Sequence, residues 1–350
     1  MFTTSVGVFV FGLLAAIGGN YAFVLTGFCV LASWGVFAAT GNTFGLDYLA
    51  FGPFMGPHIA FAGGVAAAIY ARYRGHLGDG KDVNTPLAGI GHPDILCVGA
   101  AFGIFGYLCQ IGIANIPWFG KHTDPVALTV LLSGLLARLI FGGVPGKGLF
   151  HGSLHNPELF HDNATSFPAK IKPGPNGRWL EWQEKPSQLL TIGSLFGIFA
   201  GGASLFLAAN VGAYLTTRGL ANTLAAANAN SFCFGISAVI ILFLITNRNM
   251  PVQHHVTNIA GLAAVQFFPL LMGKTFTTYH WTYTSSWDSH TWGMATVALA
   301  IAAFFGVFTA GLGEFCARLW YNRGTSHIDP PAAAIWLGNT VVVSLATLFS

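Results

Sequence analysis

Two copies of a short motif hold the side chains of this chain that are best suited to moving protons. Both read H-x-D-P-x-A, and they are His122-Thr123-Asp124-Pro125-Val126-Ala127 and His327-Ile328-Asp329-Pro330-Pro331-Ala332. Aspartate favours the N-cap of a helix and proline favours its first turn, so each copy predicts a helix start. The histidine two residues earlier adds a proton acceptor. We predict that His122, Asp124, His327 and Asp329 act in gating or proton coupling at opposite mouths of the protein, with helix capping alone as the alternative.

A second pair of similar segments begins with a histidine. The two segments are His58-Ile59-Ala60-Phe61-Ala62-Gly63-Gly64-Val65-Ala66-Ala67 and His255-Val256-Thr257-Asn258-Ile259-Ala260-Gly261-Leu262-Ala263-Ala264. Ionisable residues inside membrane segments are costly and tend to face a cavity or a partner. The N–H groups at a helix start also suit an oxygen atom of a solute. We therefore predict that His58, His255, Thr257 and Asn258 bind substrate; the alternative places both histidines at the membrane interface without a role in binding.

A few other polar residues interrupt the apolar runs. Asn20 and Asn210 lie beside glycines, where a broken helix would expose carbonyl groups to a solute, so both are predicted substrate-binding residues. Glu314 is a candidate proton or cation site, although Arg318 four residues later makes an intrahelical ion pair the alternative. No spacing of His, Cys, Asp or Glu matches a metal signature. We expect no metal and no cofactor.

Composition sets the class of protein. Only 8% of the 350 residues are charged and 53% are hydrophobic, whereas a soluble domain has about 25% charged residues. This excludes a soluble enzyme and a nucleic-acid binder. The chain also lacks a Walker motif, a GxSxG nucleophile elbow and a CxxCH haem motif, so we predict no enzymatic activity. The five cysteines fall in apolar runs and are interpreted as packing residues. The predicted class is an all-α polytopic membrane protein.

The apolar runs predict the membrane spans, because a helix crosses about 30 Å of hydrocarbon with roughly 20 residues. Ten runs qualify, at about 4–18, 22–38, 57–72, 94–114, 124–143, 190–215, 230–246, 253–272, 291–317 and 330–349. The first two are joined by Gly18-Gly19-Asn20 and form either two helices or one broken helix. If the segment 144–189 is cytoplasmic, all of the 15 Lys and Arg residues except Lys121, Arg218 and Lys274 fall on its side, as the positive-inside rule requires.

The repeated segments predict two halves of opposite orientation. A third similar pair, Phe102-Gly103-Ile104-Phe105 and Phe305-Gly306-Val307-Phe308, keeps the same order along the chain. Five predicted helices separate the two H-x-D-P copies, and an odd number of crossings places the copies on opposite sides of the membrane. We therefore predict five helices in each of two inverted repeats, residues 1–143 and 190–350, joined by the cytoplasmic linker 144–189. In architecture alone this resembles urea transporters, ammonium channels and several secondary transporters, and no site residue is carried over from them.

An inverted repeat favours transport by alternating access. The sequence predicts a permease for a small polar or anionic solute. Its transport could be coupled to protons or to other ions. A channel-like facilitator for a small neutral solute, a membrane subunit of a larger complex and a membrane enzyme are the alternatives. The expected partners are the solute and the lipid bilayer of a bacterial inner membrane, with no nucleic acid; a homo-oligomer is compatible with the sequence.

Overall fold

The computed structural model describes residues 16–142, 179–246, 248–322 and 324–349, and these residues form helices and no β-strand. Within them, seven helices are long and apolar enough to cross a membrane. They are α2 (Gly19–Thr40), α4 (Pro93–Ala114), α6 (Pro125–Ala137) with its π-helical extension η4 (Arg138–Gly142), α8 (Pro186–Thr217), α9 (Leu224–Ile245), α11 (Ser289–Cys316) with its π-helical extension η8 (Ala317–Tyr321), and α12 (Pro330–Leu348). The predicted all-helical class is confirmed.

Two other predicted spans form helices that are not among these seven. Helix α3 (Ala60–Tyr73) has 14 residues and α10 (His254–Leu271) has 18, and most residues of both are buried. The remaining short elements are η2 (Gly45–Ala50), η3 (Leu87–Ile90), α5 (Phe119–His122) and η7 (Thr284–Ser286). Helices α3 and α10 therefore form the inside of the bundle rather than its lipid-facing surface.

The start of the chain bears on the predicted span count. The run 4–18 lies almost wholly outside the described residues, as does most of the linker 144–189, so ten spans stay a prediction. Gly18 has φ 94°, a left-handed value that glycine adopts readily, and α2 begins at the next residue. The predicted break between the first two runs is therefore located at Gly18.

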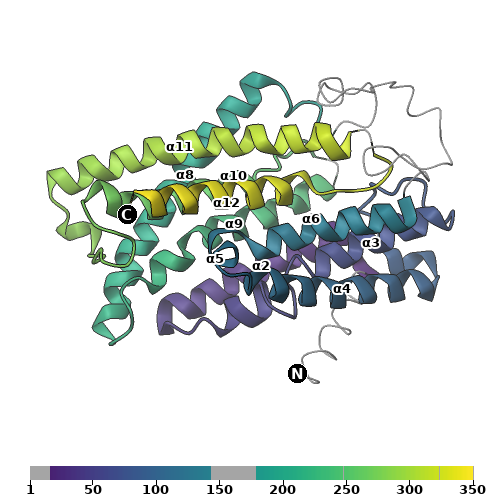
Figure 1. Ribbon diagram of the computed structural model, residues 1–350, viewed down its shortest axis with the longest axis horizontal. Coiled ribbons are helices and arrows are strands. Elements are labelled where there is room, and N and C mark those ends of the chain that lie inside the picture. The colour runs from purple at the N-terminus through teal and green to yellow at the C-terminus, as the bar shows by residue number, and fades with distance from the viewer. Residues whose placement is uncertain (1–15, 143–178, 247, 323, 350) are drawn as a thin grey trace.

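Helices α6 and α12 contact each other and run in opposite directions (Figure 1). They overlap along most of α6 and the first half of α12. Thr123, just before α6, shares a hydrogen bond of 2.9 Å with Thr340 in the middle of α12. Reciprocally, Gly134 in α6 lies against the backbone of His327 and Ile328, just before α12. The starts of both helices are thus brought inside the bundle.

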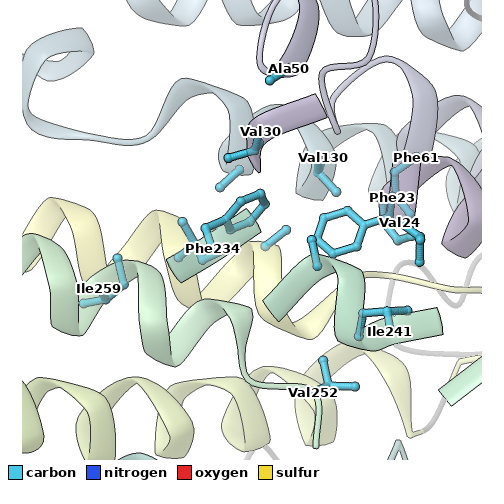
Figure 2. Packing of buried hydrophobic residues seen from close by; sticks show 14 of the residues in the cluster. Phe23, Val24, Val30, Ala50, Phe61, Val130, Phe234, Ile241, Val252 and Ile259 are labelled. Atoms are coloured by element: carbon cyan, nitrogen blue, oxygen red, sulfur yellow. The ribbon is translucent and has the colours of Figure 1, made fainter. Parts of the chain in front are cut away.

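Aromatic and branched side chains fill the space around these helix starts. Phe23 of α2, Phe61 of α3 and Phe234 of α9 belong to one buried cluster, with Val130 of α6 nearby (Figure 2). Small residues bring the neighbouring backbones close: Gly106 of α4 lies against the carbonyl group of His58. This cluster connects helices from both predicted halves and surrounds the cavity described next.

Candidate functional site

A cavity of about 230 Å³, here called the central cavity, lies where α6 and α12 overlap. A cavity of that volume is large enough for a small solute or several water molecules. Its walls come from the first two turns of α6 and α12, the starts of α3 and α10, the first half of α9, Phe23 of α2 and the segment between η2 and α3. The lining residues used below are Phe23, Phe51, Phe61, Asp124, Asn228, Asn230, Ser231, Phe234, His254, Asn258 and Asp329.

Asp124 and Asp329 both line the central cavity and both cap a helix. Asp124 accepts a hydrogen bond of 2.8 Å from the Ala127 N–H, and Asp329 accepts one of 2.7 Å from the Ala332 N–H. These bonds and the positive end of the helix dipole stabilise the ionised carboxylate. The sequence predicted these residues at opposite outer mouths; the structure instead places them at the cavity wall, because α6 and α12 begin inside the bundle.

The two carboxylates lie toward opposite ends of the central cavity. Thr123, next to Asp124, is hydrogen-bonded to Thr340. Thr340 follows Asp329 by eleven positions along α12, or about 16 Å at 1.5 Å per residue. The cavity is therefore elongated along the two antiparallel helices, with one capping carboxylate near each end.

Polar side chains of α9 and α10 form another part of the wall. The Asn230 side-chain amide donates a hydrogen bond of 2.6 Å to Asn258 Oδ1. Ser231 accepts a hydrogen bond of 2.8 Å from the Trp34 indole N–H. Thr257, a predicted neighbour, is buried and instead shares a hydrogen bond of 2.9 Å with Ser237. Of the predicted pair on α10, only Asn258 therefore faces the cavity.

His254 is a cavity residue that the sequence reasoning missed in favour of His255. It is 6% exposed and its ring centroid lies 4.7 Å from that of Phe23 and 5.9 Å from that of Phe234. Its Nδ1 atom has no hydrogen-bond partner among the described residues. An unpartnered acceptor in a buried site is costly unless a solute or water satisfies it.

A second, smaller cavity of about 50 Å³ adjoins the first and shares four residues with it: Phe23, Phe61, His254 and Asp329. The ring centroids of Phe23 and Phe61 are 5.7 Å apart. The second cavity lies between these rings and Trp179, at the end of the bundle that carries the linker. Phe23, Phe61 and His254, here called the aromatic partition, therefore separate the two cavities.

Two predicted residues line only the second cavity. His327 is 5% exposed, and its Nε2 atom lies 3.2 Å from Asp329 Oδ1. The side-chain amide of Asn20 donates a hydrogen bond of 2.6 Å to Asn84. Both are thus positioned along a route toward the linker end rather than at the central cavity.

The other predicted histidines contact protein groups. His58 and His255 are almost fully buried, line neither cavity, and lie against Gly106 and Gly313 of the long helices that follow them. His122 lies 2.7 Å from the Trp118 carbonyl oxygen through Nδ1, and its ring stacks on the Trp118 indole. Protein groups therefore hold His122. The ring nitrogens of His58 and His255 have no hydrogen-bond partner among the described residues, although both side chains lie outside the two cavities.

Asn210 and Glu314 also lie away from both cavities. Asn210 accepts hydrogen bonds of 3.3 and 3.2 Å from the backbone and hydroxyl of Thr284. Glu314 forms the ion pair with Arg318 that was its alternative interpretation, at 2.7 Å. Both residues therefore stabilise links between or within helices.

The charge of the central cavity is one-sided. Its wall carries two carboxylates, and none of its described lining residues is Lys or Arg. Among the described residues, no group of three or more His, Cys, Asp and Glu side chains is arranged to hold a metal ion. The site can bind a polar or positively charged solute through carboxylate, amide and imidazole groups.

Comparison with known proteins places the chain in a family without giving it a function. A family of unknown function (DUF7973) matches residues 2–350, and the chain belongs to this family. No curated protein and no solved structure matches it.

Proposed function

We propose that this member of the DUF7973 family is a membrane permease that binds a small polar solute in the central cavity and releases it to either side by alternating access. One observation carries the proposal. The cavity is walled by the starts of α6 and α12, which carry the repeated H-x-D-P motif and approach from opposite directions. A site shared by two antiparallel elements is what two inverted repeats require.

The contacts of the two predicted halves support this proposal. Helix α3 contacts α2, α4 and α6, and α10 makes the matching contacts with α9, α11 and α12. In each half the short helix is preceded or opened by a histidine that lies against a glycine of the next long helix. Five helices in each half follow if the run 4–18 forms the counterpart of α8.

The aromatic partition supplies a barrier on one side of the proposed site. Phe23, Phe61 and His254 close the central cavity toward the second cavity and the linker end. Alternating access requires such a barrier to open when the opposite side closes. In a channel-like facilitator, the alternative function, the two cavities join into one continuous path when the partition moves.

A transport assay separates the permease from the facilitator. The purified protein is reconstituted into liposomes and tested with amines, amino acids, sugars and carboxylates, with and without Na⁺, at pH 5.5 and 7.5. A permease gives saturable uptake that internal unlabelled solute accelerates, whereas a channel gives no such acceleration. No flux of any solute refutes both functions.

Matched variants connect the flux to the cavity. Asn258→Ala changes the cavity wall, and Asn210→Ala changes an amide outside the cavity with its own protein partners. The proposal predicts a loss of uptake in Asn258→Ala that exceeds any loss in Asn210→Ala. Equal uptake in both variants would place the site elsewhere.

A further inference from the structure

We infer that the central cavity binds a small organic cation, an alkylammonium ion, which the carboxylates of Asp124 and Asp329 attract from the two ends of the cavity and which phenylalanine rings along the walls contact. The transport of this cation rests on the proposed function, whereas its binding rests on the cavity alone. The inference replaces the anionic solute that the sequence allowed with a solute of opposite charge.

The charge balance of the wall is the first argument. Asp124 and Asp329 each bring a carboxyl group to the wall, which carries a full negative charge when it is ionised, whereas a helix end brings about half a positive charge. Helix α10 begins without a side-chain cap and adds another half charge at most. The uncapped start of α3 adds about half a positive charge as well. At the starts of α6 and α12, however, each carboxylate exceeds the half charge of the helix that it caps, so an anionic solute would meet repulsion near both carboxylates.

The aromatic rings are the second argument. Phe23, Phe51, Phe61 and Phe234 all line the central cavity, and Phe51 and Phe234 lie 5.6 Å apart between ring centroids. The faces of aromatic rings attract cations, and several rings around one site are the usual way of holding a quaternary ammonium group. Phenylalanine offers no hydrogen bond, so these walls favour an alkylated ammonium over a strongly hydrated inorganic ion.

The third argument concerns Nδ1 of His254, a ring nitrogen without a hydrogen-bond partner among the described residues. This side chain is more than nine-tenths buried, lines the cavity, and has an Nδ1 atom without a partner among the described residues. A neutral imidazole accepts a hydrogen bond through its unprotonated nitrogen. His254 Nδ1 can therefore accept a hydrogen bond when it is unprotonated and a solute N–H or O–H group reaches it. The imidazole at the wall thus suits a cation that also carries a hydrogen-bond donor.

A pair of probes of the same shape tests the charge. Choline and its uncharged carbon isostere, 3,3-dimethylbutan-1-ol, are titrated into the purified full chain, with acetate as the anion, and binding is read by calorimetry and thermal stabilisation. We expect choline to bind about tenfold or more tightly than the isostere, and acetate not to bind. Equal binding of choline and the isostere, preferential binding of acetate, or no binding of choline overturns the inference.

Substitutions that keep the helix caps locate the charge. Asparagine caps helices about as well as aspartate, so Asp124→Asn and Asp329→Asn remove charge while keeping the bond to the helix N–H group. We expect each to weaken choline binding by about tenfold or more, because each removes one negative charge from the cavity wall. Asp288→Asn is the control, because Asp288 caps α11 with the same bond, 2.8 Å from the Thr291 nitrogen, on the exposed surface. Unchanged binding in both cavity variants overturns the inference.

The outcomes distinguish this inference from the permease. Choline binding without flux of any solute keeps the cation site and refutes the permease. Flux of another solute together with no choline binding keeps the permease and refutes the cation site.

Discussion

The close approach of α3 and α4 gives a sharp test of the architecture that forms the central cavity. A Cβ atom on Gly106 of α4 would overlap the carbonyl oxygen of His58, which precedes α3. The overlapped atom belongs to the backbone, so no rotation of a side chain relieves the overlap. Gly112 lies on the same helix, six residues later, with no atom within 4 Å of an added Cβ. Gly106→Ala thus adds a methyl group at a tight backbone contact, whereas Gly112→Ala adds the same group in open space.

The expected effects have opposite signs. Overpacking a tight contact lowers the stability of the folded state by about 1–3 kcal/mol. Replacing a glycine within a helix by alanine raises that stability by about 0.5–1 kcal/mol. Gly106→Ala should therefore lower the free energy of unfolding by about 1–2 kcal/mol, because most of α3 is buried and cannot move away freely. Gly112→Ala should leave the free energy unchanged or raise it by up to about 1 kcal/mol.

The measurement is thermal or denaturant unfolding of both variants and the parent protein in the same detergent. Pro57, which lines the central cavity, directly precedes His58, so Gly106→Ala should also reduce solute binding. Equal stability of the two alanine variants would refute the contact between α4 and His58, and with it this wall of the cavity.

Three further outcomes follow from the geometry. Asp124→Ala should lower the free energy of unfolding by about 1 kcal/mol and Asp124→Asn by only a few tenths, as measured by denaturant unfolding. An equal loss in both variants would refute the role of Asp124 as the cap of α6. Phe61→Ala should open the aromatic partition and raise unstimulated solute leak through liposomes, whereas unchanged leak would place the barrier elsewhere. Cysteine replacing Lys121 should react with an impermeant reagent from outside and cysteine replacing His92 from the linker side, because α4 separates these exposed positions; reaction from one side alone would contradict the predicted orientation.

Much of the fold could be predicted from the sequence because membrane spans differ sharply in composition from their connections. The H-x-D-P motif located the starts of α6 and α12, since the N-cap and first-turn preferences are local. The short, Gly/Ala-rich composition of the segments after His58 and His255 predicted that these helices differ from lipid-facing spans, and both are buried.

The sequence could not identify which face of each helix lines the cavity. In a soluble protein the polar face of a helix reveals its orientation, but a membrane helix is apolar toward lipid and toward the core alike. Asn228, Asn230 and Ser231 therefore did not stand out at the start of a predicted span. His254 and His255 are adjacent, and only the rotation of α10 decides that the first faces the cavity and the second faces Gly313.

The choice of aspartate at two buried helix starts is itself an argument for a cationic partner. An N-cap needs only a side-chain acceptor, and serine, threonine or asparagine supplies one without charge. At the exposed cap of α11 the charge of Asp288 is solvated and costs little. The Asp329 side chain is only 13% exposed, and a buried carboxylate is costly even when hydrogen-bonded, unless an opposite charge compensates it. At Asp329 a protonated His327, whose Nε2 atom is 3.2 Å away, can supply that charge. The proposed cationic solute would supply it to both carboxylates, since none of the described residues that line the cavity is Lys or Arg.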